Sequence, residues 1–332
     1  MDESPTRTVL DLMTGYWASQ SVYTAAALNL PEHLEAGRTT SREVAAATGA
    51  HQRSLFQLMR FLAGLGLLRG DDESGFTLTP AGALLRKDAP DSLHDLVLMY
   101  GDEFYRTWGR LLDHVRTGRP AFEHTFGEPM YPYLAAHPEA ARRFDGTMAG
   151  GAFFADLPRV HDFSGARTVV DIAGGTGALL REVLRASPGA RGVLFDQAHV
   201  IAAARDVIGD AAPADRISYA TGDYTESIPV GGDVYLWSRI LHSRSDDSCV
   251  DLLKRCRDAM TPDGTVIVLE RTIPPTGETS LGLWFDLQMM VLVGGSERSE
   301  SQYAELFDRA GLALGPVHPL SLDMYAITAS RA

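Results

Sequence analysis

Residues 169–180 read VVDIAGGTGALL, and this stretch decides the fold class. An apolar run ends at Asp171, a turn containing Gly174, Gly175 and Gly177 follows, and a helical pattern then begins. Glycine accepts positive φ values and lets the backbone approach a ligand closely. A strand, a glycine-rich turn and a helix in this order are typical of a nucleotide-binding site in an open α/β sheet.

Short apolar runs alternate with helical segments on the C-terminal side of this turn. Strands separated by helices indicate a doubly wound parallel sheet with helices on both faces. The expected strands are 168–172, 192–196, 217–223, 233–237 and 265–270, with a final pair near 314–319 and 323–329.

The N-terminal part reads as mostly helical. Residues 8–36 have apolar positions at helical spacing, which predicts one long helix or two short ones. Residues 39–70 predict a helix, a turn at Thr48 and Gly49, and a second helix. Residues 75–86 predict a short hairpin and the start of another helix, which completes a winged-helix pattern.

Net charge, cysteine spacing and the distribution of apolar residues indicate which partners and which cellular compartment to expect. The 332 residues carry a formal net charge of −13, which disfavours nucleic acid as a partner. Cys249 and Cys256 lie on one predicted helix with Cα atoms roughly 10 Å apart, too far for a disulfide, so we expect free thiols in a reducing compartment. The N-terminus does not resemble a signal peptide, and no apolar run approaches a membrane span. We therefore expect a cytoplasmic protein with no membrane partner.

Two features favour S-adenosylmethionine over a dinucleotide as the ligand of the glycine turn. Leu180 occupies the place of the third glycine of a G-x-G-x-x-G pattern. Asp196, at the end of the second strand, can accept both hydroxyls of a ribose, a role shared with dinucleotide-binding folds, so the glycine pattern decides between the two ligands. The trio Gly222, Asp223 and Tyr224 follows the third strand and offers a carboxylate for an adenine amino group beside an aromatic face. An ordinary turn at a strand end is the alternative for this trio.

Three ionisable residues fall where open α/β sheets bind ligands, beyond the carboxyl ends of strands. His242 follows the fourth strand, Glu270 ends the fifth, and Glu297 follows a helix. A phenol with a pKa near 10 is a poor nucleophile until a base such as histidine removes its proton. A carboxylate on the second ring nitrogen orients such a histidine. We predict this catalytic group, with a structural histidine and two surface charges as the alternative.

Nearly the whole chain resembles the plant caffeic-acid-type, metal-independent small-molecule O-methyltransferases and their actinobacterial relatives in antibiotic biosynthesis. Each motif alone is weak evidence for this family, but the motifs in combination are highly specific for it. The stretches that carry the resemblance are FTLTPAGALLR (76–86), TGRPAFEHTFG (117–127), HPEAARRFDGTM (137–148), DIAGGTG (171–177), GDYTESIP (222–229), LHS (241–243) and DLQMMVLVGGSERSESQY (286–303).

The resemblance implies an α/β fold whose Rossmann-like sheet has seven strands, the last antiparallel, behind a mostly helical winged-helix dimerisation domain. It implies domains at 1–100 for dimerisation, 101–157 for a helical linker to the acceptor pocket, and 158–332 for catalysis. It also implies a homodimer in which each partner contributes to the other's substrate pocket.

The resemblance also assigns roles to single residues. His242 is then the general base, flanked by Glu270 and Glu297, and no metal is required. Contacts to the methyl donor come from Gly174, Asp196, Asp223, Tyr224 and Ser238. The acceptor pocket is lined by Trp108, Phe144, Met148, Met289 and Met290, with core packing as the alternative.

The expected acceptor is a phenolic hydroxyl of a small, polyketide-type aromatic molecule, and S-adenosylhomocysteine is the expected second product. Among the actinobacterial relatives, the chain looks similar to the naphthoic acid O-methyltransferases of enediyne biosynthesis. One departure concerns the His-Asp-Trp of the family, which here reads His242-Ser243-Arg244. Some relatives use the bound donor for hydroxylation, decarboxylation or pericyclic chemistry, which is one alternative. A winged-helix transcriptional regulator is another, disfavoured because residues 52–66 contain only two arginines.

Overall fold

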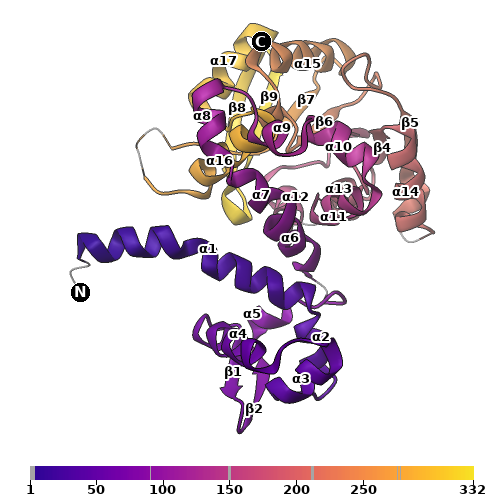
Figure 1. The fold of residues 1–332 in the computed structure, drawn as a ribbon. Helices are drawn as coiled ribbons and strands as arrows, with labels where there is room; N and C mark the ends of the chain where they lie inside the picture. Colours follow the sequence, from indigo (N-terminus) through magenta and orange to yellow (C-terminus); the bar gives the residue numbers. More distant parts are fainter. Residues whose placement is uncertain (1–3, 90, 149–150, 211–212, 275, 277) are drawn as a thin grey trace. The chain divides into compact units, whose positions relative to one another are not determined.

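The computed structural model describes residues 4–89, 91–148, 151–210, 213–274, 276 and 278–332. The chain divides into two compact units (Figure 1). Unit 1 comprises Met1–Gly109 and Tyr131–Thr147, and unit 2 comprises Arg110–Met130 and Met148–Ala332. The domain boundaries expected near residues 100 and 157 stay a prediction.

Unit 1 begins with the winged-helix elements. Their bounds are α1 (Pro5–Ala27), α2 (Leu30–Glu35), α3 (Ser41–Thr48), α4 (Gln52–Gly64), β1 (Leu68–Asp71), β2 (Gly75–Leu78) and α5 (Pro80–Ala83). Thr40 and Glu43 form a capping box at the start of α3, and Gly49 ends that helix with a φ of 75°. The hairpin pairs Leu68 with Leu78, so its first strand precedes the 75–86 segment in which we expected the hairpin.

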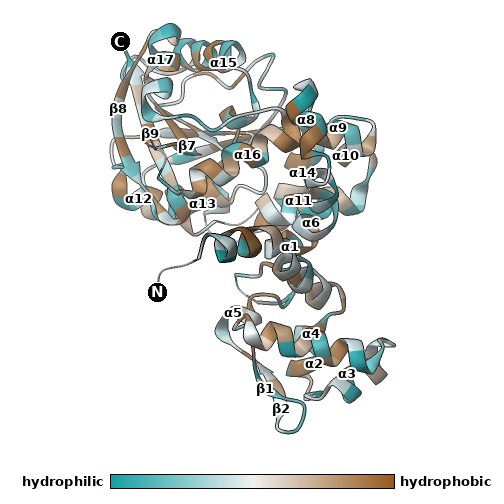
Figure 2. Ribbon diagram, turned by 60° about the vertical axis from the view of Figure 1, so that its left-hand side comes forward, coloured by the Kyte–Doolittle hydropathy of each residue, from teal (hydrophilic) through white to brown (hydrophobic). Residues whose placement is uncertain are grey.

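The rest of unit 1 is helical. It contains α6 (His94–Met99), a π-helix η1 (Tyr100–Phe104), α7 (Tyr105–Trp108), and most of α10 (Met130–Ala136) and α11 (Pro138–Met148). Helix α1 carries hydrophobic residues along its length (Figure 2). Four of its large apolar side chains are 55 to 75% exposed in the single chain: Val9, Leu12, Met13 and Trp17. An apolar surface of this kind marks an interaction site.

Unit 2 is built on a seven-stranded sheet in the order β5-β4-β3-β6-β7-β9-β8. Strands β3 to β7 are parallel, whereas β9 runs antiparallel to both of its neighbours. The expected α/β fold with an antiparallel last strand is therefore confirmed. The strands are β3 (Thr168–Ile172), β4 (Arg191–Asp196), β5 (Ile217–Thr221), β6 (Val234–Ser238), β7 (Thr265–Arg271), β8 (Leu312–Pro319) and β9 (Met324–Arg331).

Helices cover both faces of this sheet. Since side chains alternate along a strand, Tyr235 and Trp237 of β6 pack with α15 and α17, while Val234 and Leu236 pack with α13 and α14. The helical elements of unit 2 are α8 (Leu111–Thr117), α9 (Ala121–Phe126), η2 (Ala152–Phe154), α12 (Leu157–Val160), α13 (Ala178–Ala186), α14 (Ala198–Ile208), η3 (Ala214–Arg216), η4 (Leu241–Ser243), α15 (Asp246–Ala259), α16 (Leu281–Val293), α17 (Glu300–Ala310) and η5 (Ser321–Asp323).

The strand order of the large sheet indicates where a ligand would bind. The strand order reverses at β3, whose neighbours β4 and β6 continue in opposite directions, and ligands bind beyond the carboxyl ends of strands at such a point. Cys249 and Cys256 are both buried, free thiols on α15. Among the described helices, none combines the length and apolar character needed to cross a membrane.

Candidate active site

The glycine turn between β3 and α13 is held tightly against its neighbours. Ala173, Gly175 and Gly177 all have positive φ, between 53° and 73°. A Cβ on Gly174 would lie 2.5 Å from Leu194 Cδ1 and 2.6 Å from Asp171 Oδ2, so no larger residue fits there without a shift. The turn therefore presents bare backbone at the carboxyl edge of the sheet.

Two carboxylates lie beneath and beside this turn. Asp196 accepts hydrogen bonds from Gly175 N at 3.0 Å and from Gln197 N at 2.7 Å. Asp171 is buried, and its Oδ2 accepts no hydrogen bond from the described residues. Burial, with a smaller contribution from Asp196, raises the pKa of Asp171 to about 7. Burial also raises the pKa of Asp196. This acidic pair suits a ligand that brings hydroxyl donors and positive charge.

The predicted trio after β5 forms the next part of this edge. A Cβ on Gly222 would lie 2.8 Å from the ring of Phe195, which explains the glycine. Asp223 is exposed and accepts from Thr225 N and Thr225 Oγ1 through Oδ1 at 2.8 and 2.6 Å. These hydrogen bonds lower the pKa of Asp223. A charged carboxylate thus stands beside the aromatic ring of Tyr224.

The end of β6 carries Ser238 and Arg239. Ser238 Oγ is buried and makes no hydrogen bond to the described part of the chain. Arg239 has a φ of 58°, a strained value for a residue with a side chain. Its Nη2 donates to the carbonyl of Met148 at 2.6 Å. Strain at this position, directly before η4, is typical of a functional site.

The structure brings His242, Glu270 and Glu297 together. Nδ1 of His242 lies 2.9 Å from Glu297 Oε1 and 3.2 Å from Glu270 Oε2, and all three side chains are buried. Glu270 Oε1 also accepts from Leu241 N at 2.9 Å and from His242 N at 3.3 Å. Since both carboxylates meet Nδ1, the proton of a neutral imidazole belongs on Nδ1 and the lone pair on Nε2.

Charge keeps a proton on this group near neutral pH. Burial lowers the pKa of His242, but the facing carboxylates of Glu270 and Glu297 outweigh it, so the pKa is raised. Burial is also the main reason that the pKa of Glu270 is raised to about 7. The buried imidazole of His242 and the buried carboxylate of Glu270 thus each influence the charge of the other.

Several supporting residues were not predicted from the sequence. Arg298 is 2% exposed and donates to the carbonyls of Leu241 and Arg244 at 3.0 and 2.8 Å, which holds both ends of η4. Asp286 accepts from Glu297 N at 2.9 Å. A Cβ on Gly295 would lie 2.1 Å from His242 O, so only glycine permits this close approach. The only sequence signal for them was their place within the 286–303 motif.

The predicted acceptor-pocket residues divide between the two units. Met148, Met289 and Met290 are half-buried in unit 2. Trp108 and Phe144 are half-buried in unit 1, where the ring of Phe144 stands edge-on to Tyr131 with centroids 6.3 Å apart. Their role toward an acceptor stays a prediction.

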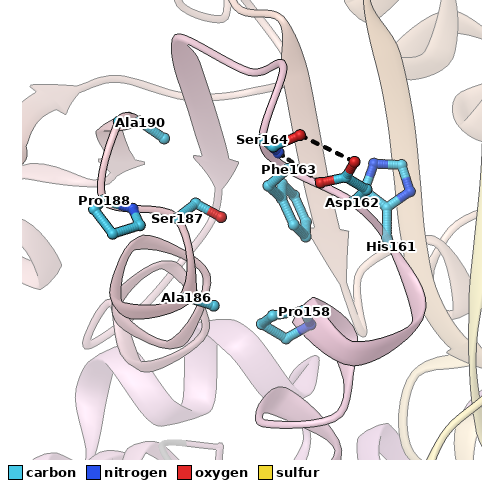
Figure 3. A pocket seen from close by; sticks show the side chains of 10 residues that line it. Pro158, His161, Asp162, Phe163, Ser164, Ala186, Ser187, Pro188 and Ala190 are labelled. Atoms are coloured by element: carbon cyan, nitrogen blue, oxygen red, sulfur yellow. Dashed lines mark hydrogen bonds between the residues drawn. The ribbon is translucent and has the colours of Figure 1, made fainter.

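A cavity of about 240 Å³ in unit 2 is a different feature (Figure 3). It is lined by residues 158, 161–164 and 186–190. The first set precedes β3 and the second precedes β4, so the cavity lies at the amino ends of these strands. Asp162 there accepts from Ser164 N and Ser164 Oγ at 2.8 and 3.0 Å. This cavity is separate from the histidine group at the carboxyl ends.

Comparisons with known proteins agree with this geometry. The family model of an O-methyltransferase domain matches residues 108–313, and that of an O-methyltransferase dimerisation domain matches residues 10–88. The chain is 42% identical over 327 residues to the 3-amino-4-hydroxybenzoate 4-O-methyltransferase of Streptomyces cremeus, covering 98% of this chain and 90% of that one. It is 36% identical to the phenazine-1-carboxylate N-methyltransferase of Pseudomonas aeruginosa, covering 98% and 97%.

Solved structures give the same result. The crystal structure of LaPhzM superposes with a TM-score of 0.93 at 37% identity, covering 99% of this chain and 100% of that one. NcsB1, an O-methyltransferase from neocarzinostatin biosynthesis, superposes with a TM-score of 0.81 at 30% identity, covering 95% and 96%. That structure contains S-adenosyl-L-homocysteine and 1,4-dihydroxy-2-naphthoic acid. The expected family of actinobacterial natural-product O-methyltransferases is thereby confirmed. The chain belongs to the S-adenosylmethionine-dependent O-methyltransferases.

Proposed function

We propose that the protein methylates a hydroxyl group of a small aromatic acceptor, with His242 as the general base. The observation that carries this proposal is the position of the imidazole, whose Nδ1 is held by Glu297 and Glu270 at 2.9 and 3.2 Å. Nε2 has no hydrogen-bond partner among the described residues and is therefore the nitrogen left for an acceptor. Two buried acids then stabilise the imidazolium that forms when Nε2 takes a proton.

The residues at the carboxyl edge of the sheet fit S-adenosylmethionine. Asp196 would accept from the ribose hydroxyls, Asp223 from the adenine amino group, and the bare backbone at Gly174 would allow close approach of the ligand. The unpartnered Oγ of Ser238 and Oδ2 of Asp171 offer further polar contacts. When bound, the donor supplies a methyl group on a positively charged sulfur, which needs alignment more than activation.

The chain's own residues perform the remaining steps. Arg298 and Glu270 hold η4, so that the imidazole keeps one orientation. His242 Nε2 removes the hydroxyl proton of the acceptor, because a phenolate oxygen attacks far better than a phenol. The pocket side chains Met289 and Met290 pack against the aromatic ring, a contact that suits flexible thioethers.

The acceptors named for the relatives are aromatic rings that carry hydroxyl, amino or carboxylate groups. We therefore propose a hydroxylated aromatic acid or a related bicyclic compound as the acceptor of this chain. One relative methylates nitrogen rather than oxygen. 3-Amino-4-hydroxybenzoate offers both atoms, so the position of the new methyl group in its product, read by NMR, decides between them.

We also propose that the protein is a homodimer that works without a metal. The exposed apolar side chains of α1 belong to the segment matched by the dimerisation family model. Ligand atoms of His242, Glu270 and Glu297 all lie within 4.8 Å of one another, a spacing that a divalent cation could also use. The direct contacts from Nδ1 to both carboxylates support the metal-free assignment.

The decisive experiment compares His242→Gln with His51→Gln, an exposed histidine of unit 1. We expect His242→Gln to lower turnover by at least about 10²-fold, while S-adenosylhomocysteine still binds in calorimetry. His51→Gln should match the wild type. Unchanged turnover in His242→Gln would remove this residue from the base role. Conversion of the acceptor into an unmethylated product, with the donor left intact, would instead favour the non-methylating chemistry.

A further inference from the structure

We infer that Arg244 is a donor-binding residue that hydrogen-bonds a ring nitrogen of the adenine, while Asp223 accepts from the adjacent amino group. The inference rests on the proposed placement of S-adenosylmethionine at the ends of β4 and β5. It assigns a ligand contact to the residue at which the sequence departs from the His-Asp-Trp of the family.

The guanidinium of Arg244 joins two loops of the site. Arg244 follows η4 after β6, yet its Nη2 lies 2.5 Å from the hydroxyl of Tyr224, which follows β5. Its Cζ lies 5.4 Å from the centroid of the Tyr224 ring, and that ring stands edge-on to Trp237 at 5.6 Å. Arg298 holds the carbonyl of Arg244 at 2.8 Å. Backbone and side chain are thus both anchored.

One donor of this anchored group has no partner. Nε of Arg244 is buried and donates to none of the described residues. A buried N–H without an acceptor is costly, and such groups are normally satisfied by protein, water or ligand. An acceptor atom supplied by a ligand between the two loops would satisfy it.

The carboxylate of Asp223 indicates which ligand atom this is. Arg244 contacts the hydroxyl of Tyr224, the residue after Asp223, and its charge adds to the hydrogen bonds from Thr225 that lower the pKa of Asp223. The two hydrogen bonds from Thr225 both use Oδ1 of Asp223, which leaves Oδ2 as an acceptor. Adenine presents an amino donor with a ring nitrogen acceptor on each side, N1 and N7. A carboxylate and a guanidinium side by side complement this pattern, whereas hypoxanthine would place a carbonyl against the carboxylate.

The test measures binding of S-adenosylhomocysteine by calorimetry, using the full-length protein. Arg244→Met keeps the length of the side chain and removes every donor. Arg255→Met is the matched control, because the exposed Arg255 binds the carbonyl of Glu226 in the same loop without joining the site. We expect Arg244→Met to weaken binding about 10- to 100-fold, as loss of a charge-assisted hydrogen bond would, and Arg255→Met to have little effect.

Analogues identify the contact as direct. The wild type should bind either the 1-deaza or the 7-deaza analogue of S-adenosylhomocysteine about tenfold or more weakly, and Arg244→Met should show no such difference. Equal affinity of Arg244→Met and wild type for S-adenosylhomocysteine would overturn the inference, as would an analogue penalty that is the same in both. If the wild type itself binds no S-adenosylhomocysteine, the proposed function fails instead. Thermal unfolding and Arg244→Lys separate a misfolded variant from a weak binder, since Lys retains a donor and should bind better than Met.

Discussion

Replacing Glu297 by Gln tests whether the carboxylate sets the basicity of His242. The variant keeps the size of the side chain and one acceptor oxygen but removes a charge that lies 2.9 Å from Nδ1. Unit charges about 4 Å apart interact by about 4 kcal/mol at an effective dielectric constant of about 20. At about 1.4 kcal/mol per pKa unit, this energy corresponds to about 3 units. Because Glu270 stays 3.2 Å from Nδ1, we expect the pKa of His242 to fall by about 1 to 3 units.

This fall has a defined effect on the pH profile. The neutral imidazole is the reactive form, so kcat/KM of the wild type rises with pH through a pKa above the ordinary value near 6.5. In Glu297→Gln this rise should occur at lower pH, by about 1 to 3 units. The plateau should fall by about tenfold or more, because a weaker base removes the acceptor proton less readily. The deficit of the variant should therefore be smallest in acid.

The assay follows S-adenosylhomocysteine formation across the pH range, with Glu300→Gln as the control. Glu300 is an exposed acid in the first turn of α17, and its loss removes the same charge from the surface. Its profile should match the wild type. A Glu297→Gln enzyme whose profile rises at the same pH as the wild type would refute this account of how the carboxylate acts. Calorimetry with S-adenosylhomocysteine checks that the variant is folded.

Three further predictions concern the donor site and the metal. Gly174→Ala places a Cβ 2.5 Å from Leu194 Cδ1, so we expect the free energy of unfolding to fall by about 1 to 3 kcal/mol and the affinity for the donor to drop. Denaturant unfolding measures the first effect and calorimetry the second. The control Gly189→Ala, which has open space around the new Cβ, should change neither quantity. Asp196→Asn should raise KM for the donor about 10- to 100-fold with little change in kcat, and an equal fall in kcat would contradict a pure binding role. Dialysis against a chelator should leave turnover unchanged. Activity lost on dialysis and restored by Mg²⁺ would assign a metal to the His242 group.

The sequence alone determined the fold class and placed His242, Glu270 and Glu297 near one edge of the sheet. Apolar runs of four to eight residues separated by helical patterns are local signals, and all seven strands of the large sheet were expected close to their observed bounds. The hairpin before α5 was misplaced, because a four-residue strand such as LRGD at 68–71 has no apolar alternation to mark it. These three residues were predicted as one group because His242 follows β6, Glu270 lies near the end of β7, and Glu297 follows α16.

Tertiary structure alone decided how these residues meet. His242 and Glu297 are 55 positions apart, and their contact at 2.9 Å depends on strand order and on the close approach that Gly295 permits. Neither determinant is visible in local spacing, because both arise from packing between distant segments. Packing between distant segments also produces the hydrogen bond from Arg298 to the carbonyl of Leu241 and the one from Arg244 to the hydroxyl of Tyr224. The order of strands and helices along the sequence specifies which side chains reach the edge of the sheet. Tertiary packing specifies which of them come into contact there, such as His242 with Glu297 and Arg244 with Tyr224.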